Sequence, residues 1–188
     1  FWLNEGWTRY AELRIVEVLE GPDTAALVAA ICRKDLDETL TRLIAEGHGG
    51  LTRPRTHLEG IDPDEAFSVV PYDKGQLFLR AIEDAVGRER FDAFAKAYLD
   101  TFRFGAVTTE AFLEFTERAL PGALASVDAP RWIDGEGFLF LFTKYTKGRE
   151  LYWSTSPDGK TWATDQKFAG IGGHYQTSHQ VGGTIITA

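Results

Sequence analysis

The stretch that decides the fold class runs from Trp7 to Leu19 and reads WTRYAELRIVEVL. Its apolar residues recur at intervals of three and four, which is the spacing of one face of an α-helix. The tripeptide Gly21-Pro22-Asp23 follows directly, and this composition is typical of a helix end. The sequence therefore predicts a helix that stops at Gly21.

The same helical spacing returns several times further along the chain. Gly87 is expected to cap one of these helices, and Thr108 with its polar neighbours is expected to open another. The remaining helical segments are expected at Thr24–Ile31, Leu36–Ala45, Lys74–Val86, Phe91–Phe102 and Ala111–Leu120.

The pattern changes at Phe138 to short aromatic and β-branched runs, which are typical of strands. These runs are Phe138–Tyr145, Glu150–Thr155 and Thr184–Thr187. Acidic residues outnumber basic ones before residue 138, and the balance reverses after it. We therefore expect a mainly α protein in two incomplete domains. Residues 1–137 would form a helical lobe, and residues 138–188 a small antiparallel β-meander resembling one propeller blade.

Composition excludes several classes of function. The chain has 188 residues and a net charge of −8, which argues against nucleic acid as a partner. It contains no apolar run long enough for a transmembrane segment, and its one cysteine permits no internal disulfide. The sequence lacks methionine and opens on Phe1-Trp2-Leu3, so we expect it to be a piece of a longer protein. The compartment is not assigned.

The residues taken alone leave the roles of two side chains open. Glu5 stands near a predicted helix start, where a carboxylate either complements the helix dipole or binds a metal ion. Tyr72 stands in a similar place, where it is either packed in the core or directed at a ligand. The four histidines show no spacing typical of a metal site.

Three blocks in order resemble one enzyme family. Residues 1–8, FWLNEGWT, resemble the W-L-N-E-G-[FW]-[TA] signature of zinc aminopeptidases of the gluzincin family, which includes aminopeptidase N and leukotriene hydrolase. Residues 62–75, DPDEAFSVVPYDKG, resemble the D-P-D-x-A-[FY]-S-x-V-P-Y-E-K-G block of its leukotriene-hydrolase branch. Residues 131–137, RWIDGEG, resemble the segment that closes the catalytic domain in that branch.

The resemblance implies a thermolysin-like helical lobe, the C-terminal half of a catalytic domain that removes N-terminal residues from peptides. It implies that Glu5 is the third zinc ligand, beside two histidines of an H-E-x-x-H motif. It also implies that Tyr72 stabilises the oxyanion, while zinc polarises the scissile carbonyl and the H-E-x-x-H glutamate acts as general base. Asp64 and Phe67 match substrate-binding positions.

Two departures from the family pattern matter. Phe67 stands where leukotriene hydrolase carries a tyrosine, which favours an aminopeptidase over an epoxide hydrolase. The H-E-x-x-H motif, which precedes the ligand glutamate in this family, is not in the sequence. Because one carboxylate does not hold zinc usefully, we expect the chain alone to be inactive.

The tail suggests an alternative. Residues 156–162, SPDGKTW, resemble the Asp-box hairpin of sialidase-like β-propellers. The alternative function is a non-catalytic carbohydrate- or protein-binding module in which residues 138–188 contact a glycan. The break near Phe138 is either a natural fusion or an artificial join, and the sequence leaves both open.

Overall fold

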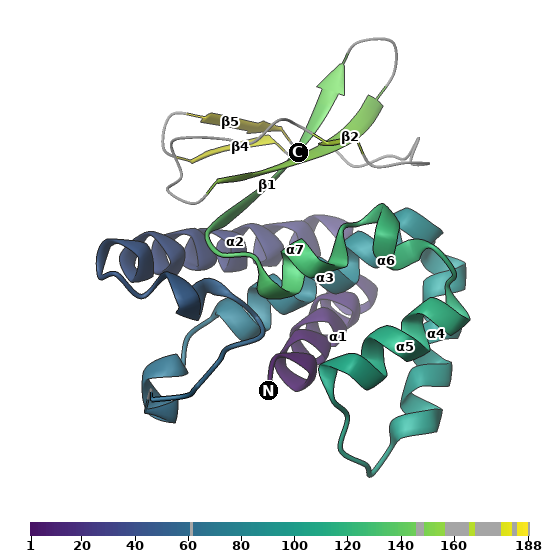
Figure 1. Ribbon diagram of the computed structural model, residues 1–188. Coiled ribbons are helices and arrows are strands. Elements are labelled where there is room, and N and C mark those ends of the chain that lie inside the picture. Colours follow the sequence, from purple (N-terminus) through teal and green to yellow (C-terminus); the bar gives the residue numbers. More distant parts are fainter. Residues whose placement is uncertain (61, 146–148, 157–165, 168–177, 182–183, 188) are drawn as a thin grey trace. The chain divides into compact units, whose positions relative to one another are not determined.

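The computed structural model describes residues 1–60, 62–145, 149–156, 166–167, 178–181 and 184–187. The chain divides into two compact units, Phe1–Glu136 and Gly137–Ala188. The helices of the first unit are α1 (Trp2–Glu20), α2 (Pro22–Ala45), η1 (Gly49–Thr52), η2 (Pro63–Ala66), α3 (Val70–Val86), α4 (Arg88–Phe102), α5 (Thr109–Ala119), α6 (Ala123–Ser126) and α7 (Ala129–Asp134). The N-terminal end of α1 lies between the η2 segment and α5 (Figure 1).

The first two helices follow the predicted break. Helix α1 ends before Gly21, which adopts φ of 90°, a conformation that glycine reaches without steric cost. Pro22 then opens α2, where a residue without an N–H fits the first turn. The two segments predicted after Pro22 are one continuous helix, because the polar residues 32–35 between them contain no helix breaker.

The predicted caps of the later helices are confirmed. Gly87 has φ of 87°, and its N–H donates to the Glu83 carbonyl at 2.7 Å at the end of α3. The Thr108 hydroxyl accepts a hydrogen bond from the Ala111 N–H at 3.1 Å at the start of α5. Helix α3 begins one turn before the predicted segment, at Val70, because proline in a first turn is compatible with a helix.

The core of the helical unit forms around one face of α3. Phe78, Leu79 and Ile82 are almost fully buried there. The ring of Phe78 lies 5.9 Å from those of both Trp2 and Trp132, so α1 and α7 pack on the same helix. Burial of this aromatic area stabilises the unit and holds α1 against α3.

The apolar stripe of α1 does not mark its buried face along the whole helix. Ile15, Val18 and Leu19 are 56%, 81% and 73% exposed. The buried face of α1 instead carries Gly6 and Tyr10. Of the helices described, none is both long and apolar enough to cross a membrane.

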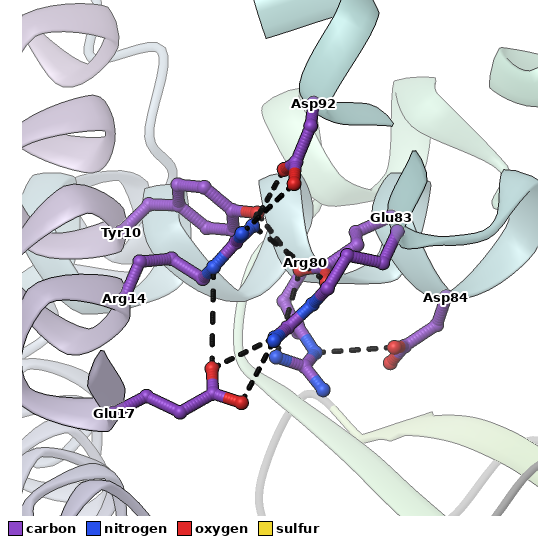
Figure 2. Close-up of polar contacts among 8 residues, drawn as sticks. Tyr10, Arg14, Glu17, Arg80, Glu83, Asp84 and Asp92 are labelled. Carbon is purple, nitrogen blue, oxygen red and sulfur yellow. Dashed lines mark hydrogen bonds and ion pairs between the residues drawn. The ribbon is translucent and has the colours of Figure 1, made fainter. Parts of the chain in front are cut away.

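A polar network lies beside aromatic contacts where α1, α3 and α4 meet (Figure 2). Its centre is Glu83, whose side chain is 2% exposed. Glu83 accepts hydrogen bonds from the Tyr10 hydroxyl and from Arg88 Nε, both at 2.8 Å. Arg14 of α1 in turn binds Asp92 of α4 through two hydrogen bonds of 2.8 and 3.0 Å. The network therefore ties α1 to both α3 and α4.

The prediction of a β-meander resembling a propeller blade is wrong. A blade requires four neighbouring strands in one sheet. The described strands of the second unit are β1 (Phe138–Tyr145), β2 (Arg149–Ser156), β3 (Gln166–Lys167), β4 (Ser178–Val181) and β5 (Thr184–Thr187). They divide between a sheet of order β1-β2-β3 and a separate β4-β5 pair, both antiparallel. Most of the predicted Asp-box hairpin, residues 157–162, lies outside the described residues.

Candidate functional site

The candidate site lies where the N-terminal ends of α1 and α3 meet. Glu5 belongs to the first turn of α1 and Tyr72 to the first turn of α3, and both are half-buried. The two helix backbones approach closely beside them, at Gly6 and Gly75. Residues that are far apart in the sequence are thus brought together at one end of a helix pair.

Glu5 and Tyr72 interact directly. Burial raises the pKa of the Tyr72 phenol, and the Glu5 carboxylate raises it further by its charge and by accepting a hydrogen bond. The charge of Arg9 acts in the opposite direction, but the pKa remains raised. The phenol is therefore protonated at neutral pH and is available as a hydrogen-bond donor.

Arg9 lies one helical turn after Glu5 and was not predicted from the sequence. It pairs with Glu12 at 2.6 Å and with the buried Asp73 of α3 at 3.1 Å. Burial raises the pKa of Asp73 to about 6, despite the opposing charge of Arg9. The spacing of Glu5, Arg9 and Glu12 by four and three residues is the signal that could have placed these charges on one helix face.

An aromatic group borders the site. The Phe1 ring lies 5.4 Å from that of Phe67 and 6.4 Å from that of Tyr72, both edge to face. Phe67 is 65% exposed, so this group offers apolar surface to solvent next to the Tyr72 phenol. The structure therefore brings Phe67 close to Tyr72, with Phe1 between them.

Asp64 lies further out, on η2. Its side chain is exposed, and its N–H donates to the Asp62 carboxylate at 3.0 Å in a local turn. Among the described residues, no contact joins its carboxylate to Glu5 or Tyr72.

Among the residues that the structure describes, Glu5 is the metal-ion donor that the candidate site offers. A half-buried carboxylate fits one position of a zinc site, because zinc accepts oxygen donors. In the part of the chain that the structure describes, no three His, Cys, Asp or Glu side chains gather in a group that could hold a metal ion. His48 and His57 are exposed. The described residues therefore fit a single protein ligand and do not complete a site.

Lys74 anchors the first turns of α3 to neighbouring segments. Its buried ammonium donates to the carbonyls of Thr52 and Gly135, both at 2.8 Å. Burial and the charge of Arg53 lower the pKa of Lys74 to about 7. The lysine thus links the helix start that carries Tyr72 to η1 and to the segment after α7. The sequence motif contained this lysine, but nothing in the motif indicated that it is buried.

The chain is similar in sequence to proteins of one enzyme family. Residues 1–132 match the model of the peptidase family M1 domain. The chain is 40% identical to leucine aminopeptidase 2-1 of Meyerozyma guilliermondii over 114 residues, which is 61% of this chain and 18% of that protein. It is 31% identical to aminopeptidase B of Rattus norvegicus over 175 residues, which is 88% of this chain and 27% of that protein.

The fold itself also has a counterpart among solved structures. Native leukotriene A4 hydrolase from Saccharomyces cerevisiae matches with a TM-score of 0.69 and 34% identity. The match covers 73% of this chain and 22% of that one. The chain thus spans about a quarter or less of the length of these relatives, as the shares of 18%, 27% and 22% show.

Proposed function

The chain belongs to peptidase family M1, and on that premise we propose that it contributes Glu5 and Tyr72 to the catalytic site of a zinc aminopeptidase. The parent enzyme would remove N-terminal residues from peptides. The observation that carries the proposal is that Glu5 and Tyr72 stand at the adjoining ends of α1 and α3, beside the backbone approach of Gly6 and Gly75. We further propose that residues 1–137 are part of the helical lobe of its catalytic domain.

Glu5 would supply one carboxylate ligand to zinc, and bound zinc would polarise the carbonyl of the scissile peptide bond. The remaining protein ligands of this family come from an H-E-x-x-H motif that the sequence does not contain. A single ligand gives no useful zinc affinity. We therefore expect the isolated 188-residue chain to hydrolyse no aminoacyl-anilide substrate, even with zinc added.

Tyr72 would donate a hydrogen bond from its phenol to the oxyanion that develops as the peptide carbonyl is attacked. Its raised pKa supports this role, because only the protonated phenol can donate. The half-buried position of Tyr72 also supports it, because a donor partly withdrawn from water stabilises charge more strongly than one in bulk solvent.

Phe67 and Asp64 would contact the substrate rather than the reacting carbonyl. The exposed Phe67 ring extends the apolar surface beside Tyr72, where a side chain of the peptide could pack. Asp64 presents an exposed carboxylate, which suits the positive N-terminal amine of a peptide. Both roles are supported by the match of residues 62–75 to the family motif and by the exposure of the two side chains.

The decisive experiment is Tyr72→Phe in the full-length protein, assayed for turnover of aminoacyl-anilides together with zinc content. We expect turnover to fall by about 10²–10³-fold with zinc still bound, as for the loss of one oxyanion donor. Tyr98→Phe is the matched control, because Tyr98 packs in the aromatic core of α4. A loss of less than about threefold for Tyr72→Phe would remove Tyr72 from the mechanism.

The alternative function, a carbohydrate- or protein-binding module, has no support. It depended on a propeller-type domain, and the strands that the structure describes after residue 137 do not form one blade. The relatives described above are named as aminopeptidases and as a leukotriene A4 hydrolase. We therefore advance no second function.

A further inference from the structure

Two glycines bring α1 and α3 into backbone contact. A Cβ atom at Gly6 would lie 3.0 Å from both the carbonyl carbon and the Cα of Gly75. A Cβ atom at Gly75 would lie 3.0 Å from Gly6 Cα and 3.3 Å from the Trp2 carbonyl oxygen. All these neighbours are backbone atoms, which move only if a whole helix moves. Neither position can therefore accept a side chain unless the two helices separate.

The crossing lies immediately beside the candidate site. Glu5 is the residue before Gly6, and Tyr72 lies one helical turn before Gly75. Glu5 is on α1 and Tyr72 on α3, so the two side chains belong to the same pair of helices. If the two backbones separate at the glycines, Glu5 and Tyr72 therefore move apart with them.

The other end of the helix pair is held in place. The Tyr10 hydroxyl of α1 donates to the Glu83 carboxylate of α3 at 2.8 Å. Beyond it, Glu17 of α1 accepts two hydrogen bonds, at 2.7 and 2.8 Å, from Arg88 at the start of α4, and Arg88 also donates to Glu83 of α3 at 2.8 Å. An alanine at the crossing would therefore move α1 and α3 apart next to Glu5 and Tyr72, although the ion pair of Arg9 with Asp73 also joins the two helices there.

Both glycines occupy helix interiors, where glycine is a poor helix former. On local grounds alone, alanine at either position would stabilise its helix. Gly50 of η1 offers a contrast, because a Cβ atom there would meet nothing within 4 Å.

We propose that Gly6 and Gly75 are positioning residues whose backbone contact sets the separation between the Glu5 carboxylate and the Tyr72 phenol. This inference rests on the proposed function in so far as it concerns catalysis. It also makes a purely structural claim, that the separation of the two side chains depends on the glycine contact, which can be tested without turnover.

The catalytic test is a double-mutant cycle in the full-length protein. Gly6→Ala and Gly75→Ala should each lower kcat by about tenfold to 10²-fold, as expected for a displacement of up to about 1 Å at a reacting centre. In the Tyr72→Phe background the same alanines should lower kcat by less than about threefold, because the displaced group is already absent. Gly50→Ala should change neither background. Equal losses in both backgrounds would overturn the proposal.

The structural test uses the zinc-free protein with 3-fluorotyrosine at position 72. Its ¹⁹F resonance should shift in Gly6→Ala and Gly75→Ala and remain unchanged in Gly50→Ala. If the resonance shifts but Tyr72→Phe keeps wild-type turnover, the proposed function fails while the positioning claim stands. If the resonance does not shift, the positioning claim fails whatever the turnover. If both alanine variants fail to fold while Gly50→Ala folds, the glycines serve packing alone and the proposal is overturned.

Discussion

Replacing Glu83 by Gln should destabilise the helical unit, because this buried carboxylate faces cations from three directions. Its oxygens lie 2.8 Å from Arg88 Nε, 3.5 Å from Arg80 Nη1 and 3.9 Å from Arg14 Nη1. It also accepts the hydrogen bond of the Tyr10 hydroxyl at 2.8 Å. Glutamine has the same shape, so the variant removes the charge and one acceptor without leaving a cavity.

The size of the effect follows from these contacts. The remaining glutamine oxygen can accept one of the two short hydrogen bonds, whereas the new NH₂ group faces a donor at the other. Breaking a fully buried ion pair costs about 3–5 kcal/mol. The side chains of Arg14, Arg80 and Arg88 are 23%, 25% and 38% exposed, so water screens part of the lost attraction. We therefore expect the free energy of unfolding to fall by about 2–3 kcal/mol.

Urea unfolding of the 188-residue chain, followed by far-UV circular dichroism, measures this loss. The matched control is Asp92→Asn, since Asp92 binds the same network but is 48% exposed. That variant should cost less than about 1 kcal/mol, and its cost should shrink further in high salt. Equal costs for the two variants, or a cost at Glu83 below about 0.5 kcal/mol, would refute the view that Glu83 is the centre of the network.

Four further outcomes test other parts of the structure. The pKa of Lys74 is lowered to about 7 in the folded chain and is about 10.4 in an unfolded one, so the unfolded chain binds the extra proton between these values. Stability should therefore rise from about pH 7 to about pH 10, and urea titrations of Lys74→Met should show a flatter rise. The pKa of Asp73 is raised to about 6, so the folded chain keeps a proton that the unfolded chain has released above about pH 4. Stability should fall as pH rises across that window, and the same titrations of Asp73→Asn should lack the fall. Thr108→Ala removes the N-cap of α5 and should lower the free energy of unfolding by about 1 kcal/mol, as measured by urea midpoints at neutral pH. Phe112→Ala empties a fully buried site and should lower it by about 3–5 kcal/mol in the same assay, whereas a cost under about 1 kcal/mol would contradict its place in the core.

The helices were predictable because their signals are local. Gly21-Pro22 and Gly87 end helices through backbone conformations that few other residues adopt cheaply, and Thr108 opens one through a hydrogen bond three residues away. Two helices were predicted where α2 is continuous. The apolar pattern is interrupted between them, but the interruption contains neither glycine nor proline, so the helix continues through it. The blade was wrongly predicted because strand patterns indicate strands, but they do not indicate whether two neighbouring strand groups join into one sheet.

The candidate site was only partly predictable. The motifs named Glu5 and Tyr72, but they did not reveal that the two residues stand on either side of a close helix crossing. The signal for the crossing was present in Gly6 and Gly75, because glycine inside a helical pattern often marks close backbone approach. The burial of Lys74 depends on carbonyls from Thr52 and Gly135, and no local pattern could bring these segments together.

The polar face of α1 explains how its rotation about its own axis is fixed. Apolar side chains of similar size tolerate a helix that turns slightly, because their contacts have no preferred direction. Hydrogen bonds between charged groups lose strength quickly when their angles change. Tyr10 bonds to Glu83 and Arg14 bonds to Asp92 with two nitrogens, so a rotation by one residue would break both contacts at once. We infer that this network holds α1 in the single orientation that turns Glu5 toward α3. Ile15 and Val18 stay exposed in that orientation, although they lie beside Arg14 on the helix surface.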